Sequence, residues 1–288
     1  MKSRIIAGFK RAFNLHRPGR NVEVFPDDTF LLSYPKSGNT WSRFLVANLI
    51  HTDGPVDFSN INGIIPSTEG TTKRYLTSVP RPRVLKSHEY FDPRYPKIVF
   101  IVRDPRDVVL SEYHWDIKRR ALKDDCRIED FVERFVHGPL NHPFGTWGDN
   151  VASWFYTRRN SPSFLLIKYE SLQTDPVREV TRIARFLNIP AGPDRIEFAF
   201  QQSSADRMRE LERKQGPVWA STKETRQDKP FIRSAKSGGW KAELPEPCTA
   251  RLEAVWGGLM RDLGYELATP GLGDPSAKET ACLANGGR

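Results

Sequence analysis

Short apolar runs alternate along the chain with longer stretches that have the 3.6-residue periodicity of helices. Four of the runs are apolar on both faces and are bounded by Pro, Ser or charged residues, as strands buried in a parallel sheet are. These predicted strands span residues 29–35, 83–88, 97–103 and 163–169. The predicted helices span residues 39–51, 105–120, 127–137, 148–159, 175–187, 193–213 and 247–263. This alternation predicts an α/β domain in which helices cover a mainly parallel central sheet.

Three segments depart from this alternation and divide the chain. Residues 212–240 are polar and almost free of periodicity, and a loop of this length inside a domain is typically functional or disordered. Gly, Ala and Pro are frequent in residues 267–288, which we expect to be a disordered tail. Residues 1–21 form a basic arm, so the folded domain is expected to span residues 22–266.

The composition is typical of a globular protein and offers no metal site. Hydrophobic residues make up 38% of the chain and charged residues 27%, and no apolar run is long enough to cross a bilayer. Cys126, Cys248 and Cys282 are widely spaced and form no C-x-x-C pair, which argues against a zinc site and against a disulfide framework. So few cysteines indicate a reducing compartment, and we expect a cytoplasmic protein.

The positive charge is concentrated in the N-terminal arm. The formal net charge of the chain is +9. Six basic residues and no acidic residue lie in the first twenty positions, namely Lys2, Arg4, Lys10, Arg11, Arg17 and Arg20. They account for +6 of the +9 and leave only +3 for the rest of the chain. Charge localised in this way argues against a broad nucleic-acid-binding face, and we expect no nucleic-acid partner.

The arm has the pattern of a basic amphipathic helix. Its sequence, "MKSRIIAGFKRAFNLHRPGR", lacks the continuous apolar region of a signal peptide. On a helix, the residues that share one apolar face would be Ile5, Ile6, Phe9 and Phe13. This pattern predicts a peripheral anchor on the inner membrane surface. The alternatives are a helix packed on the protein's own core and a frayed basic terminus.

A strand-to-helix turn, "YPKSGNTW" at residues 34–41, has the composition of an anion-binding loop. The four residues after Lys36 would present backbone N–H groups at the start of a helix, where unpaired donors and the helix dipole favour an anion. These residues are Ser37, Gly38, Asn39 and Thr40. Lys36 adds a positive charge, but it precedes the single glycine, unlike the lysine of G-x-x-x-x-G-K-[ST]. The alternative is an ordinary connection in which Ser and Asn only cap the helix.

Two further strand ends carry polar residues suited to the same ligand, because open α/β sheets bind ligands at the carboxyl ends of their strands. Lys86 and His88 end the second predicted strand, and a histidine there could take a proton from an alcohol. Arg103 ends the third strand, where its guanidinium could make two hydrogen bonds to a phosphate. Ser111 lies two turns into the next helix and could reach the same anion only if the ligand lies along that helix.

Together these segments resemble the cytosolic-type sulfotransferases that use 3′-phosphoadenosine 5′-phosphosulfate (PAPS). "YPKSGNTW" is similar to that family's 5′-phosphosulfate loop, and "LKSHE" is similar to its K-T-H catalytic segment. "RDPRDVVLSEYH" resembles the 3′-phosphate segment, with an arginine and a serine eight residues apart. "KYESL" resembles the Y-E-D-L element, and "FIRSAKSGGWKAEL" resembles the late R-K-G-x-x-G-D-W-K loop. The five segments occur in the family's order, over roughly residues 28–245.

The resemblance implies a three-layer, P-loop-like α/β fold with PAPS as co-substrate and no metal. It implies that His88 is the general base, that Lys36 stabilises the leaving phosphate, and that Lys86 lies beside the transferring group. The residues implied to bind PAPS are Lys36, Ser37, Gly38, Asn39, Thr40, Trp41, Arg103, Ser111, Tyr169, Ser203, Arg233, Ser234 and Ala235. Among them, Arg103 and Ser111 would hold the 3′-phosphate and Trp41 would stack on adenine.

Several positions depart from the family pattern. Residues 233–235 are Arg-Ser-Ala in place of R-K-G, which weakens two expected 3′-phosphate contacts, and Lys236 is the candidate substitute. Gly239 replaces the aspartate of the G-D-W element. Ala205 falls where a family aromatic would stack, so we expect Trp41 to lack that partner.

The resemblance implies in-line transfer of a sulfuryl group from PAPS to a hydroxyl of a small-molecule, lipid or carbohydrate acceptor. The acceptor would bind in the variable regions 52–82, 112–150 and 212–232. The aromatic residues and histidine there that could contact it are His114, Trp115, Phe144, Trp147 and Trp219. A P-loop nucleotide kinase and a non-catalytic nucleotide-binding protein are the alternatives. The oligomeric state is not predicted.

Overall fold

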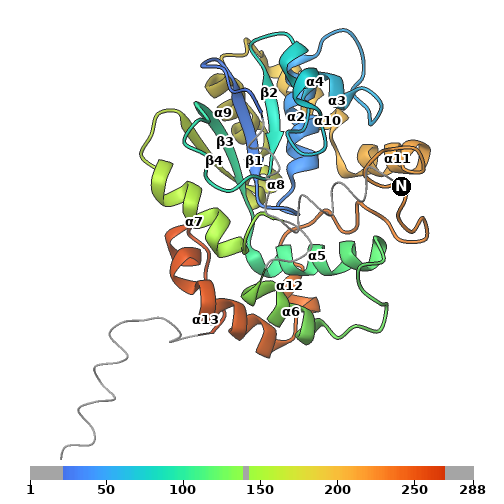
Figure 1. Ribbon diagram of the computed structural model, residues 1–288, viewed down its shortest axis with the longest axis vertical. Helices are drawn as coiled ribbons and strands as arrows, with labels where there is room; N and C mark the ends of the chain where they lie inside the picture. Colours follow the sequence, from blue (N-terminus) through green and yellow to red (C-terminus); the bar gives the residue numbers. More distant parts are fainter. Residues whose placement is uncertain (1–21, 139–142, 270–288) are drawn as a thin grey trace, which may run out of the picture.

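The computed structural model describes residues 22–138 and 143–269. Four parallel strands form the central sheet in the order β2-β1-β3-β4 (Figure 1). The strands are β1 (Thr29–Ser33), β2 (Val84–Ser87), β3 (Lys97–Val102) and β4 (Phe164–Lys168). The predicted α/β fold with a parallel central sheet is confirmed.

Helices cover both faces of the sheet and make the three layers (Figure 1). One layer contains α2 (Asn39–Ile50), α9 (Pro176–Leu187), α10 (Pro193–Gln202) and α11 (Ala205–Gln215). The other contains α5 (Pro105–Lys118), α6 (Ile128–His137), α7 (Trp147–Arg158) and α13 (Glu246–Asp262). The short helices are α3 (Ile61–Ile64), α4 (Lys73–Ser78), α8 (Tyr169–Thr174) and α12 (Trp240–Glu243).

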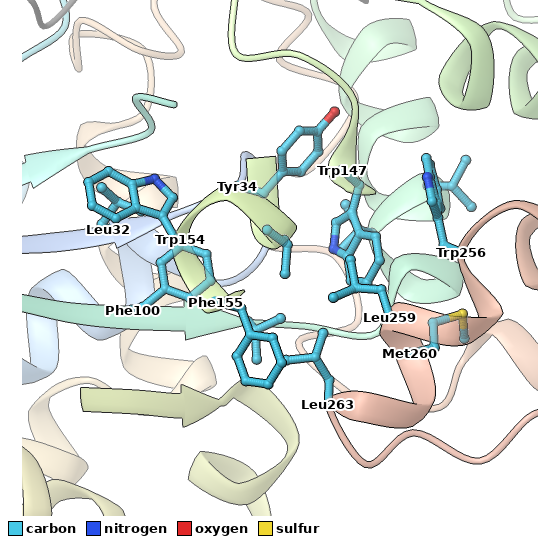
Figure 2. Close-up of a cluster of buried hydrophobic side chains, with 14 of the residues drawn as sticks. Leu32, Tyr34, Phe100, Trp147, Trp154, Phe155, Trp256, Leu259, Met260 and Leu263 are labelled. Atoms are coloured by element: carbon cyan, nitrogen blue, oxygen red, sulfur yellow. The ribbon is translucent and has the colours of Figure 1, made fainter. Parts of the chain in front are cut away.

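Side chains of the strands alternate between two hydrophobic cores, as a sheet covered on both faces requires. Leu31 belongs to the core shared with α2, α9 and α10, whereas Leu32 belongs to the core shared with α5, α7 and α13. Figure 2 shows the second core, in which Leu32 and Phe100 of the sheet lie near Trp154 of α7. The apolar character of both faces of each strand therefore has one cause, which is burial on both sides.

Trp147 belongs to this second core, although the sequence places it among the candidate contacts of an acceptor. It is fully buried, and its ring centroid lies 5.4 Å from that of Trp256 in α13 (Figure 2). Trp147 begins α7, and this helix end packs against α13. Its position in the second core therefore corrects the expectation of acceptor contact.

The helix predicted over residues 193–213 is two helices. α10 ends at Gln202 and α11 begins at Ala205, with two serines between them. The Ser203 hydroxyl donates to the carbonyl of Ala199 (2.7 Å), and the Ser204 hydroxyl accepts from the backbone N–H of Arg207 (3.3 Å). Ser204 therefore caps α11, because serine side chains compete with the helical backbone for its own hydrogen bonds.

The ends of the chain are described only in part. The predicted tail starts at residue 267, and its first residues still contact the domain, because Ala268 and Thr269 donate their N–H groups to Glu253 (2.9 and 2.8 Å). The rest of the tail and the predicted basic arm lie outside the described residues. Within the described ranges, no helix combines the length and the apolar character needed to cross a membrane.

A buried ion pair joins the starts of the two strands β1 and β2. Arg83 and Asp28 are both fully buried, and Nη2 of the arginine lies 2.5 Å from Oδ2 of the aspartate. Arg83 also donates to the carbonyls of Leu76 (2.6 Å) and Glu23 (2.8 Å). The guanidinium therefore links the beginning of the sheet to the segments that precede each strand.

We expect Arg83→Met to lower the free energy of unfolding by about 3–5 kcal/mol, because it leaves the Asp28 carboxylate buried without its partner. Arg81→Met is the control, because Arg81 pairs with Asp27 on the surface, where the two side chains are 46% and 40% exposed. The control substitution should lower the free energy of unfolding by less than about 1 kcal/mol. Urea unfolding followed by tryptophan fluorescence measures both, and equal losses would contradict the assignment of the strong contact to Arg83.

Candidate active site

A cavity of about 850 Å³ opens at the carboxyl ends of the sheet, a size typical of small-molecule sites. Each strand end contributes a side chain to its wall. Lys36 follows β1, His88 follows β2, Arg103 follows β3, and Tyr169 follows β4. The strand order places them along the edge as His88, Lys36, Arg103 and Tyr169. The side chains predicted from the three strand ends therefore do meet in one site.

The loop after β1 is held in a backbone shape that exposes the start of α2. Gly38 caps α2 with φ +90°, and a Cβ there would lie 2.4 Å from the Tyr169 ring. Only glycine fits this close approach in the left-handed region. Gly38, Thr40 and Trp41 line the cavity, where the first N–H groups of α2 have no partner within the helix.

Two of the predicted loop residues are bonded to the segment that ends β1, and of these Asn39 lines the cavity whereas Ser37 does not. The N–H of Ser37 donates to the carbonyl of Tyr34 (3.3 Å), and the Asn39 side chain donates to Oγ of Ser33 (3.1 Å). Both residues are buried. They fix the loop to the end of β1, so the donors available to an anion are those of Gly38 and the first turn of α2.

The Lys36 ammonium lies between two aromatic rings of the cavity. Its Nζ is 4.6 Å from the ring centroid of Trp115 in α5 and 4.7 Å from that of Phe231. Burial lowers the pKa of Lys36 to about 8, while Glu112 opposes this shift and Arg103 adds to it. Near neutral pH the side chain is still mainly protonated, as a group that binds an anion must be.

His88 is held in the orientation of a base. Its Nδ1 lies 2.7 Å from the carbonyl oxygen of Ser33, an acceptor only, so Nδ1 carries the proton and Nε2 is the basic nitrogen. The backbone N–H of His88 donates to the Glu69 carboxylate, and its carbonyl accepts from Asn150 (3.3 Å). Backbone and side chain are thus both fixed at the end of β2.

Glu69 is a site residue that sequence reasoning missed. Its carboxylate accepts from Lys86 Nζ (2.8 Å), and burial opposes its charge, yet Lys86 and His88 bring the pKa of Glu69 down to about 2. Burial lowers the pKa of Lys86, and Glu69 opposes that change. Lys86 therefore lines the cavity as one half of an ion pair. No local pattern marks Glu69, because it lies in a loop that meets β2 through tertiary contacts alone, among them an isolated bridge between Ser67 and Lys86.

Arg103 joins the loop after β1 to the late loop, which spans residues 226–240. Its guanidinium is 4.4 Å from the ring centroid of Tyr169 and donates to the carbonyls of Lys36 (3.4 Å) and Lys236 (3.0 Å). Its Nε is buried and has no hydrogen-bond partner among the described residues. A buried, unsatisfied donor on a cavity wall is a candidate anion contact. Ser111 lines the same cavity from α5.

Asp104 acts as a helix cap. Its side chain accepts from the backbone N–H of Arg106 (2.9 Å), and Pro105 follows it as the first residue of α5. The same carboxylate pairs with the Arg106 guanidinium at 2.6 Å. Within residues 22–138 and 143–269, no three metal-binding side chains lie together.

Side chains from three helices hold the backbone of the late loop, residues 226–240. Lys118 of α5, 2% exposed, donates to the carbonyls of Arg226 (2.7 Å) and Lys229 (2.5 Å). Glu212 of α11 accepts the N–H groups of residues 231 and 232, and lies 3.9 Å from Lys118. The other such contacts come from Asp107, Gln173 and Arg209.

The late loop carries the Arg-Ser-Ala sequence at residues 233–235 that stands in place of the family's R-K-G. Arg233 lines the cavity, but its guanidinium is paired with Glu243 at 2.7 Å. Ser234 and Ala235 also line it, and Ala235 has φ +52°, in the left-handed region where R-K-G would have glycine. Lys236, the candidate substitute, is exposed and does not line the cavity.

The adenine side of the site differs from the sequence expectation. Ser203 is fully buried and does not line the cavity, because its hydroxyl is bonded to the carbonyl of Ala199 in α10. Ala205 does line it. Trp41 nevertheless has an aromatic neighbour, because its ring lies at 74° to that of Tyr169 with centroids 5.4 Å apart.

All three variable regions reach the cavity. Tyr75 comes from the first region, Trp115 and Phe144 from the second, and Trp219 and Phe231 from the third. Trp219 also stacks on Phe58 at 4.1 Å. His114, a further sequence candidate, does not line the cavity and lies 3.7 Å from Glu243. Aromatic rings of the cavity wall therefore lie beside both His88 and Lys36.

The chain is similar in sequence and fold to known sulfotransferases. The family model described as "Sulfotransferase domain" matches residues 26–264. Rat sulfotransferase 1E1 is 28% identical over 261 residues, which cover 84% of this chain and 87% of the rat protein. Mouse sulfotransferase 2B1 is 30% identical, over 81% of this chain and 71% of the mouse protein. The crystal structure of mouse sulfotransferase SULT7A1 complexed with PAP has a TM-score of 0.69 at 24% identity and covers 85% of this chain and 89% of that one.

Lys118→Met should release the late loop, because two carbonyls lose a charged donor and each such bond contributes roughly 1.5–3 kcal/mol. We expect native-state cleavage by subtilisin within residues 226–240 to become at least about tenfold faster, as opening of the segment becomes easier. Lys123→Met, at an exposed position near the end of α5, is the matched control. An unchanged cleavage rate in Lys118→Met would show that the lysine does not hold the loop.

Proposed function

The chain belongs to the sulfotransferase domain family, and we propose that it moves the sulfuryl group of PAPS to a hydroxyl group of a small-molecule acceptor. One observation carries the proposal. His88, Lys36 and Arg103 line one cavity in that order along the edge of the sheet. A base, a cation for the leaving group and a cation for a second phosphate are what transfer from PAPS requires, in that spatial order.

The cavity fits a bisphosphorylated nucleotide on two structural grounds. Gly38 leaves the space beside Tyr169 that any Cβ would fill, at the positive end of α2. Arg103 lines the β3 end of the cavity, and its Nε is buried without a hydrogen-bond partner among the described residues. We assign the 5′-phosphosulfate to the loop after β1 and the 3′-phosphate to Arg103 and Ser111. Arg233 would contribute only after separating from Glu243.

In the proposed transfer, His88 Nε2 takes the proton of the acceptor hydroxyl while the oxygen attacks sulfur. The hydrogen bond from Nδ1 to Ser33 favours this step, because it places the lone pair on Nε2 and stabilises the imidazolium that forms. Lys36 offsets the charge that develops on the leaving phosphate oxygen. Lys86 lies beside the transferring group and stays in place through its pair with Glu69. Glu89, the adjacent carboxyl, does not line the cavity.

The aromatic wall supports an apolar or aromatic acceptor. Trp115, Phe144 and Phe231 line the part of the cavity near His88 and Lys36. Among the relatives, a retinol dehydratase structure is described in a complex with retinol and PAP. We therefore propose a hydroxylated aromatic or apolar small molecule, with lipid and carbohydrate hydroxyls as the other classes to test.

Incubation with ³⁵S-labelled PAPS and a mixed panel of phenols, sterols, fatty alcohols and sugars tests the function directly. We expect label to appear in one class of the panel and the unlabelled bisphosphate to bind by calorimetry. Absence of both transfer and bisphosphate binding would overturn the proposal. Transfer to sugars or fatty alcohols would retain the activity and change the acceptor class.

His88→Ala should reduce turnover by about 10²-fold or more, the usual contribution of a general base. Affinity for the bisphosphate should remain within about threefold of the wild type, because His88 lies at the β2 end of the site rather than beside Arg103. Lys36→Ala should lower both turnover and affinity. Radiolabel transfer measures turnover and calorimetry measures affinity, so together they separate the two variants. Near-normal turnover by His88→Ala would show that His88 is not the base.

The bisphosphate affinity should fall as pH rises through about 8, because burial lowers the pKa of Lys36 to about that value and only the ammonium attracts phosphate. Between the pH at which the phosphate groups are ionised and about pH 8, the affinity should stay constant, because the phosphates are charged and Lys36 is protonated. Lys36→Arg should keep its charge and remove the decline. Calorimetry between pH 7 and 9.5 measures this, and the same decline in the arginine variant would assign it to another group.

A further inference from the structure

Arg43 of α2 lines the cavity, and the proposed transfer gives it no role. Its guanidinium contacts the segment after α3, because Nε donates to the carbonyl of Ile65 (2.7 Å). The same segment runs beside β2, where the carbonyl of Pro66 accepts the N–H of Lys86 (2.9 Å). Arg43 therefore lies at the β2 end of the site, which is also the end at which His88 lies.

Only one side of this guanidinium is bonded to the protein. Nη2 donates to the carbonyl of Ile61 (3.3 Å) and to Oδ1 of Asn62 (2.7 Å), and with Nε it also donates to the carbonyl of Ile65. These bonds hold α3 against α2 (Figure 1). The residue is 7% exposed, yet its Nη1 has no hydrogen-bond partner among the described residues and, unlike Nε of Arg103, keeps accessible surface. A guanidinium fixed in this way offers its open N–H₂ group to an anion.

The cations that line the cavity differ in their partners. They are Lys36, Arg43, Lys86, Arg103, Arg119 and Arg233. We assign Lys36 and Arg103 to the nucleotide. Three others are each paired with a carboxylate, namely Lys86 with Glu69, Arg119 with Asp116 and Arg233 with Glu243. Arg43 pairs with no carboxylate of the described residues, and no role in the transfer is assigned to it.

The surroundings of Arg43 leave one positive charge uncompensated. Burial lowers the pKa of Arg43 to about 10, and Glu69 opposes this shift, so the guanidinium is charged at neutral pH. Glu69 is already the partner of Lys86, so this carboxylate faces two cations. A charge taken out of water is costly in free energy unless an opposite charge compensates it. An anionic group on a ligand would supply that compensation.

We propose that Nη1 of Arg43 binds a carboxylate of the acceptor, and that the enzyme therefore prefers hydroxy acids. In these acceptors an apolar or aromatic body joins the transferred hydroxyl to the carboxylate. This inference rests on the proposed function and narrows its acceptor class. The hydroxyl lies at His88, the body lies against the aromatic rings of the cavity, and the carboxylate lies at Arg43. Lys86 does not compete for the carboxylate, because Glu69 already occupies it.

The test uses pairs of phenols that differ in charge but not in shape. The acids, of increasing length, are 4-hydroxybenzoate, 4-hydroxyphenylacetate, 3-(4-hydroxyphenyl)propanoate and 4-(4-hydroxyphenyl)butanoate, and each is compared with its primary amide. We expect at least one acid to have a kcat/KM at least about tenfold above that of its amide, because a buried charged donor rejects the analogue that lacks its partner. Calorimetry with the enzyme–bisphosphate complex measures the same preference as an affinity, without turnover.

Variants at residue 43 separate the charge from the packing. Arg43→Met and Arg43→Lys both lose the planar guanidinium that holds α3, but only the lysine keeps a positive charge. Arg43→Met should use each acid and its amide within about threefold of each other, whereas Arg43→Lys should still prefer the acid by at least about fivefold. Arg43→Gln, which keeps an N–H₂ donor without charge, replaces the methionine variant if that variant unfolds.

Arg74→Met is the matched control for the loss of a positive charge at a distance. Arg74 is exposed on α4 and does not line the cavity. This variant should keep the wild-type ratio of acid to amide. A ratio that falls as far as in Arg43→Met would assign the preference to the general field of the protein and overturn the contact with Arg43.

The remaining outcomes separate failure of this inference from failure of the function. Equal use of every acid and its amide by the wild type overturns the role of Arg43 while sulfuryl transfer stands. Bisphosphate binding without transfer to any of the phenols also overturns it. An unchanged acid preference in Arg43→Met does the same and assigns the preference to another cation, with Arg119 the next candidate. Neither transfer nor bisphosphate binding by the wild type overturns the proposed function itself. Thermal unfolding of each variant verifies that a lost ratio does not reflect a lost fold.

Discussion

The site depends on one constraint, which is that the four parallel strands all end on the same side of the sheet, where their carboxyl ends meet. Because the strands run the same way, the chain leaves the sheet four times at the same edge, and each exit carries a side chain to the cavity. The order of the strands, not the order of the residues in the sequence, decides which groups are neighbours. His88 is thus beside Lys36 and away from Tyr169, although it lies between them in the sequence.

The cations of the site are held in different ways, and this difference suits their proposed roles. Lys86 is paired with a carboxylate, Arg103 donates to backbone carbonyls and also lies on the Tyr169 ring, and Lys36 lies on two aromatic rings. Of these, the aromatic contact is the weakest and least directional. Lys36 can therefore move to a developing charge at low cost, whereas the other two keep the walls of the cavity in place.

The late loop shows how a segment without secondary structure is made part of a site. Many of its N–H and carbonyl groups are bonded to side chains from α5, α8 and α11. Buried backbone groups need partners, and these side chains supply them where no helix or strand can. The position of Phe231 over Lys36 therefore depends on residues far from the chemistry, such as Lys118 and Glu212.

The sequence alone determined what depends on near neighbours. Apolar runs located the four strands, helical periodicity placed the start of α5 at residue 105, and the loop after Lys36 indicated the anion site. Tertiary structure decided the remaining contacts of the site and the core, because they join segments that are distant in the sequence. Glu69 meets Lys86 across 17 residues, Lys118 meets the late loop across 108, and Trp147 enters the core because α7 packs on α13. No local pattern records which distant backbone or charge a side chain will meet. The burial of Arg43 beside the cavity is therefore a property of the fold.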